Sequence, residues 1–167
     1  PEHGIRGNVP AGKHFLTSVD PNTGLTVYSL YDPKSKTHRP PANAMGKVDV
    51  LIYDIQDTGS RSYTYIWHLA EVMAAAAMYR KEVIVFDTPN PLGGMVVDGP
   101  IREKKYKSFI GLHPIPCVYG MTVGELARLM NKEFRINCKL KIVPMVNYRR
   151  GTTSGQTGWQ VNKTSAQ

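Results

Sequence analysis

The sequence predicts an α/β fold with a mainly parallel sheet, and three observations lead to that prediction. Two segments, 48–55 and 82–87, are mostly apolar and rich in β-branched residues, as buried strands of a parallel sheet are. A helical pattern over 63–81 separates them, so the three segments form a βαβ unit. A second helical pattern over 121–134 and a strand at 140–145 repeat the alternation.

The two strands around the first helix are apolar at most positions, and we expect each to be buried on both faces. The helix between them carries apolar residues three and four positions apart, which places them along one stripe. The run of alanines at 74–77 adds helix propensity. The residues of the stripe are Tyr65, Leu69, Val72, Met73 and Ala76.

The second helix has a start signal as well as an apolar stripe. Thr122 and Glu125 have the T-x-x-E spacing of a capping box, in which each side chain accepts a hydrogen bond from the backbone of the other residue. The stripe that follows consists of Leu126, Leu129, Met130 and Phe134.

Two parts of the chain have no periodic pattern. Residues 88–120 are rich in glycine and proline, and an irregular excursion of this length inside a compact domain is usually functional or disordered. Residues 151–167 are polar and are predicted to form a tail outside the layered domain.

Composition excludes some classes of function. The chain has 167 residues and a net charge of +8, which favours an anionic partner. Its basic residues are dispersed, with small groups at 102–107 and 148–150, and no nucleic-acid-binding motif is present, so no nucleic acid is predicted as partner. No apolar run is long enough to span a membrane. Cys117 and Cys138 lie far apart and are predicted to be reduced thiols.

Ligands of open parallel sheets bind beyond the carboxyl ends of the strands. The strand at 48–55 would deliver Asp54, Gln56 and Asp57 to that edge, and the strand at 82–87 would deliver Asp87 and Asn90. If "PEHG" (1–4) also follows a strand, Glu2 and His3 join them there.

The motifs that are absent narrow the chemistry of this edge. No G-x-G-x-x-G follows either strand, no phosphate-binding lysine loop is present, and no G-x-S-x-G is found. The remaining carboxylates, amides, arginines and histidine suit glycoside hydrolysis, and they equally suit divalent metal binding. Composition does not choose between the two.

Several long motifs resemble one known family, the NamZ-type exo-β-N-acetylmuramidases of bacterial peptidoglycan recycling. The resemblance runs through most of residues 1–150, and the two motifs around 54–65 and 87–94 are its most specific parts. The matching segments are "PEHGIRG" (1–7), "VDVLIYDIQDTGSRSYTYI" (48–66), "VFDTPNPLGG" (85–94), "PIPCVYGMTVGELARLMN" (114–131) and "YRR" (148–150).

The resemblance implies a Rossmann-like three-layer domain that is incomplete in this chain. Residues 1–150 would form the incomplete catalytic domain, and 151–167 would begin a C-terminal domain whose remainder is missing. The family's active site would lie in the cleft between the two domains. Its activity would be release of N-acetylmuramic acid from the non-reducing ends of peptidoglycan fragments, with Glu2 as the leading candidate for the catalytic acid/base.

The other site residues are predicted around Glu2. His3 would orient Glu2 or bind a sugar hydroxyl, and Asp57 is the candidate second carboxylate. Arg6 and Arg61 would pair with the lactyl carboxylate of muramic acid, since a guanidinium binds a carboxylate with two parallel hydrogen bonds. The remaining predicted substrate contacts are Asp54, Gln56, Tyr63 and Asn90.

Two other functions stay open at this point. One is a metal-dependent hydrolase that uses Asp54, Asp57, Asp87 and His3 as ligands; the other is a non-catalytic glycan-binding remnant. The leading prediction needs no cofactor and no metal, and its partner is a peptidoglycan-derived saccharide. Such a substrate favours a periplasmic or secreted parent protein over a cytoplasmic one. The sequence makes no prediction of the oligomeric state.

Overall fold

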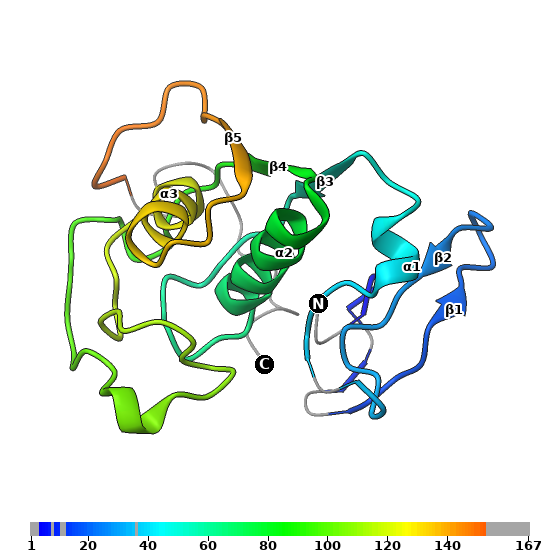
Figure 1. The fold of residues 1–167 in the computed structure, drawn as a ribbon. Coiled ribbons are helices and arrows are strands. Elements are labelled where there is room, and N and C mark those ends of the chain that lie inside the picture. The colour runs from blue at the N-terminus through cyan, green and yellow to red at the C-terminus, as the bar shows by residue number, and fades with distance from the viewer. Residues whose placement is uncertain (1–3, 8, 11–12, 36, 153–167) are drawn as a thin grey trace.

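The computed structural model describes residues 4–7, 9–10, 13–35 and 37–152. In this part of the chain two long helices lie side by side against a three-stranded parallel sheet (Figure 1). A smaller N-terminal lobe lies beside the sheet and carries a two-stranded antiparallel hairpin and a short helix. The structure therefore has the mixed α/β architecture that the sequence predicts.

The three predicted strands are present and parallel, with the second strand in the centre. Val85 of the central strand lies opposite Tyr53 on one side and Ile142 on the other. All three strands therefore end at the same edge of the sheet. Their bounds are β3 (Val50–Tyr53), β4 (Glu82–Phe86) and β5 (Lys139–Val143).

The two predicted helices are α2 (Tyr65–Tyr79) and α3 (Val123–Glu133). Helix α2 ends at Arg80, whose φ of 54° is left-handed and whose N–H bonds the carbonyls of the last turn. Helix α3 begins at Thr122 with the complete capping box that its sequence predicts. Both helices contact the sheet and each other, so they form one layer.

The prediction that both faces of the strand at 48–55 are buried is wrong for the described residues. Helices α2 and α3 cover one face of the sheet, where Tyr53, Val83 and Val85 are buried. On the opposite face Ile52 is 63% exposed, and Val50 is exposed with it. Strand β3 is an edge strand of the described sheet, and the described residues supply two of the three predicted layers.

The excursion at 88–120 is irregular, as its composition predicts. Its one described helical turn is η1 (Lys104–Tyr106). Isolated bridges join Val118 to Ser60 and to Asp98, so the excursion folds back onto the turn that follows β3. Cys117 and Cys138 are both free thiols, as predicted.

The N-terminal lobe was not predicted from the sequence. It consists of β1 (Ser18–Val19), β2 (Thr26–Val27) and α1 (Ala42–Met45). The segment between β2 and α1 packs on α2, where the Tyr31 hydroxyl lies 2.7 Å from Nε2 of His68. Among the helices described, none is long and apolar enough to cross a membrane.

Candidate active site at the carboxyl edge of the sheet

Three segments that are distant in sequence meet beyond the carboxyl ends of the strands. Gln56, which follows β3, donates from Nε2 to the carbonyl of Pro89, which follows β4, over 2.9 Å. Asn90 donates from Nδ2 to the carbonyl of Met121, just before α3, over 2.9 Å. The strand-end rule therefore located this edge correctly for the first two segments. The third segment, before α3, was not predicted to contribute.

Asp57 is the most deeply placed carboxylate at this edge, with only 4% of its surface exposed. Its Oδ2 accepts hydrogen bonds from the Gly59 N–H at 2.8 Å and from the Tyr119 hydroxyl. Its Oδ1 is buried and has no hydrogen-bond partner among the described residues. Burial raises the pKa of Asp57, and the bonds from Tyr119 and Gly59 oppose that increase.

The turn that holds Asp57 requires glycine at position 59. Gly59 has a φ of +82°, in the region that side chains other than hydrogen rarely adopt. A Cβ there would lie 2.3 Å from Oδ1 of Asn90, so the turn also packs directly on the segment after β4. The sequence Asp-Thr-Gly thus fixes both the direction of Asp57 and its closeness to Asn90.

Four buried polar atoms around this edge lack hydrogen-bond partners within the described chain. They are Oε1 of Gln56, Oδ1 of Asp57, Oγ1 of Thr88 and the hydroxyl oxygen of Tyr148, which lies near Asp87 and Gly94. Folded proteins pair nearly all buried polar groups, so a concentration of exceptions marks a place where water or a ligand completes the bonding. Thr88 was not singled out from the sequence, although it lies within the motif at 85–94.

Asn90 holds the loop after β4 in place. Besides its bond to Met121, its Oδ1 accepts the N–H of Leu92 at 2.8 Å. Both ends of the amide are therefore used within the protein. Its predicted contact with a sugar stays a prediction.

Asp54 and Tyr63 lie apart from the buried cluster. The alternation of the strand directs Asp54 to the side of Val50 and Ile52, which α2 and α3 do not cover, and Asp54 is exposed. Tyr63 is exposed, just before α2. Neither side chain forms a hydrogen bond with Gln56, Asp57 or Asn90 in the described part of the chain, so their substrate roles also stay predictions.

The Arg61 guanidinium is occupied by the excursion. Nη1 donates to the carbonyls of Pro100 at 2.8 Å and Ile115 at 2.5 Å, and Nη2 lies 3.3 Å from Sγ of Cys117. Through these contacts Arg61 connects the excursion at 88–120 to the turn after β3. Recognition of a substrate carboxylate by Arg61 stays a prediction, and it would compete with these bonds.

The Arg6 guanidinium forms an ion pair with Asp20 at 2.5 Å. About half of the Arg6 side chain is exposed, whereas Asp20 is buried. The pairing with Arg6 lowers the pKa of Asp20. Arg6 lines a hollow of the N-terminal lobe with Asp20 and Val27. Gln56, Asp57 and Asn90 do not line that hollow, so the substrate role of Arg6 stays a prediction.

Asp87 serves the start of α3. Its Oδ1 accepts the N–H of Gly124 at 2.8 Å, and its Oδ2 accepts the Thr122 hydroxyl at 3.0 Å. A carboxylate at a helix N-terminus is favourable because free N–H groups and the helix dipole point toward it. Asp87 therefore ties the end of β4 to the beginning of α3.

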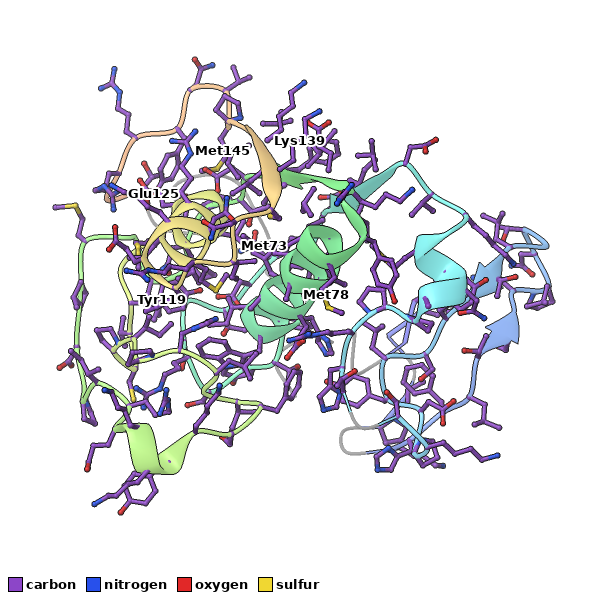
Figure 2. The ribbon with its side chains drawn as sticks, viewed as in Figure 1. Met73, Met78, Tyr119, Glu125, Lys139 and Met145 are labelled. Atoms are coloured by element: carbon purple, nitrogen blue, oxygen red, sulfur yellow. The ribbon has the colours of Figure 1, made fainter. Side chains whose placement is uncertain are left out.

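Arg150 joins three of the sequence motifs. Its Nη1 donates to the carbonyls of Gly94 at 2.9 Å and Gly120 at 3.1 Å. Its Nη2 forms an ion pair with Glu125, the residue that completes the capping box. Glu125 is labelled beside α3 at the upper left of Figure 2.

Two predicted catalytic residues, Glu2 and His3, lie outside the described residues. Among the residues that are described, no group of three or more His, Cys, Asp or Glu side chains is placed to hold a metal ion. Two of the carboxylates that the metal-dependent alternative requires already have other partners. Asp57 accepts a hydrogen bond from Tyr119, and Asp87 accepts one from the first turn of α3.

A cavity of about 450 Å³ lies elsewhere, between the N-terminal lobe and the edge strand β3. Its walls are mostly apolar and include Phe15, Met45 and Val50. Gln56, Asp57 and Asn90 do not line it. A sugar needs convergent polar groups, so the carboxyl edge suits a saccharide better than this cavity does.

The fold and this edge define a class of protein: a parallel α/β domain whose polar side chains gather beyond its strand ends, where such sheets usually bind their ligands. A family model described as "Exo-beta-N-acetylmuramidase NamZ, N-terminal" matches residues 1–167. The chain therefore belongs to the NamZ N-terminal family, as its motifs indicated.

Individual relatives agree with the family. The chain is 48% identical over 150 residues to the peptidoglycan β-N-acetylmuramidase NamZ of Bacillus subtilis (strain 168), covering 90% of this chain and 36% of that protein. A crystal structure of a DUF1343 family protein from Bacteroides fragilis NCTC 9343 matches with a TM-score of 0.86 and 43% identity, over 99% of this chain and 41% of its own. A second such protein from the same organism has a TM-score of 0.75 and 41% identity, over 91% and 39%. The chain thus spans about two fifths or less of the length of these relatives.

Proposed function

We propose that the complete polypeptide containing this chain is a glycoside hydrolase that releases N-acetylmuramic acid from the non-reducing ends of peptidoglycan fragments. Membership of the family and the peptidoglycan β-N-acetylmuramidase activity of the Bacillus relative support the substrate class. One structural observation supports the reaction type: a buried carboxylate, Asp57, has one oxygen fixed by two donors and the other without a partner among the described residues.

Two carboxyl groups suffice for this chemistry. One protonates the leaving glycosidic oxygen, and the other either attacks the anomeric carbon or activates a water molecule. We assign the first role to Glu2 and the second to Asp57, which must be ionised to act. Gln56 and Thr88 would bind sugar hydroxyls through the atoms that lack partners in the described chain. Arg6 and Arg61 are proposed to bind the lactyl carboxylate.

The test is release of N-acetylmuramic acid from a chromogenic muramide by the complete polypeptide. We expect Glu2→Gln and Asp57→Asn each to reduce kcat/KM by at least about a hundredfold, because each removes a group that reacts. Asp98→Asn is the matched control, since Asp98 lies on an exposed loop and accepts a bond from its neighbour Gly99. Wild-type rates for Glu2→Gln would reject the assignment of the acid.

The same assay separates the alternative functions. We expect EDTA to leave the rate unchanged, whereas inhibition by EDTA that Mg²⁺ or Mn²⁺ reverses would favour the metal-dependent hydrolase. Binding of muropeptides in calorimetry without turnover would favour a glycan-binding remnant.

A further inference from the structure

The Tyr119 phenol is the side chain that orients Asp57. It reaches Asp57 from the segment before α3, and its hydroxyl donates to Oδ2 (Tyr119 is labelled beside α3 in Figure 2). The Gly59 N–H donates to the same oxygen at 2.8 Å. With both donors on Oδ2, Oδ1 is the only oxygen of this carboxylate left for a reacting group.

Burial makes this hydrogen bond specific. Tyr119 is 3% exposed and Asp57 is 4% exposed, so bulk water does not replace the phenol if it is removed. A buried carboxylate is unfavourable in its charged form unless donors stabilise it. The phenol is such a donor, and it holds the carboxyl group in one rotation at the same time.

From this geometry we infer that Tyr119 is a positioning residue, which keeps Asp57 ionised and directs Oδ1 toward the substrate. The inference rests on the proposed function and adds a residue to it. It also explains why the segment "VYGM" (118–121) belongs to the edge although it follows no strand of the sheet.

The charged and titratable groups around Asp57 are few in the described chain. Tyr53 approaches from β3 and Tyr119 from the segment before α3, and each interacts electrostatically with Asp57. Burial raises the pKa of both phenols well above 10, so both are neutral donors at any working pH. Between pH 4 and 9 both tyrosines are therefore uncharged, and each acts on Asp57 only through the dipole of its hydroxyl group.

Tyr53 provides a matched control for Tyr119. It is likewise a buried tyrosine beside Asp57, at 4% exposure, but its hydroxyl donates to the carbonyl of Tyr65 at 2.9 Å. Tyr53→Phe and Tyr119→Phe therefore delete the same atom from equally buried positions. Of the two substitutions, only Tyr119→Phe removes a hydrogen bond that Asp57 accepts.

The experiment measures kcat/KM for the chromogenic muramide against pH, with the complete polypeptide and both variants. Loss of a donor to the charged form raises the pKa of Asp57, so Tyr119→Phe should move the acidic limb upward by about one to two pH units. Tyr53→Phe should leave that limb in place. An unchanged limb in Tyr119→Phe, or an equal shift in both variants, would overturn the inference.

A second substitution covers the case in which Tyr119→Phe does not fold. Fluorotyrosine at position 119 keeps the size of the side chain and makes the phenol a stronger donor, so the acidic limb should move downward. A limb that does not move contradicts the positioning role. An inactive wild-type polypeptide, by contrast, rejects the proposed function itself, so the two failures are distinguishable.

Discussion

His68 is a buried imidazole that the sequence pattern did not single out. It is 3% exposed, Nε2 contacts the Tyr31 hydroxyl, and its ring packs near Phe109. Burial, with a contribution from His38, lowers the pKa of His68 to about 3. The folded protein therefore keeps His68 neutral at pH values where an unfolded chain would protonate it.

The sign of the resulting pH dependence follows from linkage. Below the unfolded pKa of about 6.5, His68 is protonated in the unfolded chain but stays neutral in the folded protein. The unfolding free energy therefore falls by up to about 1.4 kcal/mol for each unit by which the pH is lowered. We predict that His68→Phe flattens the decrease in unfolding free energy between pH 6.5 and 4, measured by urea denaturation. Exposed His14 is the control, and His14→Gln should keep the wild-type slope. Equal slopes in all three proteins would refute the prediction.

At this scale the sequence predicted that Asp57 lies at the carboxyl edge, but it did not predict the contact with Tyr119. Asp57 was found because it follows an apolar strand, and that rule needs only local sequence. Tyr119 lies 62 positions away, and its contact with Asp57 depends on how residues 88–121 fold back. Irregular segments have no periodicity from which such a contact could be predicted.

Helix α3 is the element whose local sequence is most informative. Thr122 accepts the Glu125 N–H at 3.2 Å, and Glu125 accepts the Thr122 N–H at 3.0 Å. Thr122 also donates to Asp87, so the cap joins the helix to the end of β4. Helix stability and the geometry of the carboxyl edge are therefore coupled at one side chain.

We predict that Thr122→Ala lowers the unfolding free energy by about 1–2 kcal/mol, the usual effect of losing an N-cap. Thr122→Ser keeps a hydroxyl that can accept from Glu125 and donate to Asp87, so it should recover most of that loss. Urea denaturation at pH 7 measures both variants. Equal losses in the two would mean that the methyl group, and not the cap, stabilises α3.

The apolar stripe of α2 was predicted only in part. Leu69, Met73 and Ala76 are fully buried, as their spacing indicates. Trp67 and His68 are also buried, because the excursion and the N-terminal lobe cover further sides of the helix. The Trp67 ring lies near His113 of the excursion, with ring centroids 6.3 Å apart, and Tyr31 of the N-terminal lobe contacts His68. An apolar stripe predicts that only one face of a helix is buried. Helix α2 is covered on more than one face, and the sequence pattern does not show these additional contacts.

At the scale of the whole molecule, the described sheet has one covered face and one uncovered face. The uncovered face carries Val50 and Ile52 on the edge strand β3, whose outer backbone groups have no strand partner within the described chain. Exposed apolar edge strands pair readily with other chains. The architecture was predictable from the alternation of strands and helices, but this exposure was not, since an apolar run indicates burial.

We predict that the 167-residue chain self-associates through β3. Ile52→Lys should increase the monomer fraction in light scattering at rising protein concentration, because a charge on an edge strand opposes pairing. Val146→Lys is the control: Val146 is 87% exposed and lies in a loop after β5. If both lysine variants changed the monomer fraction equally, net charge rather than the edge would be the cause.

The bonds of Arg150 have a consequence for biosynthesis. Proteins are made from the N-terminus, and the loops around Gly94 and Gly120 leave the ribosome well before Arg150 does. Until that arginine emerges, a nascent chain holds these loops without the guanidinium that joins them to Glu125. The loops around Gly94 and Gly120 therefore gain this connection only after residue 150 has been translated, and a ribosome stalled before that residue would carry the strands and helices without it.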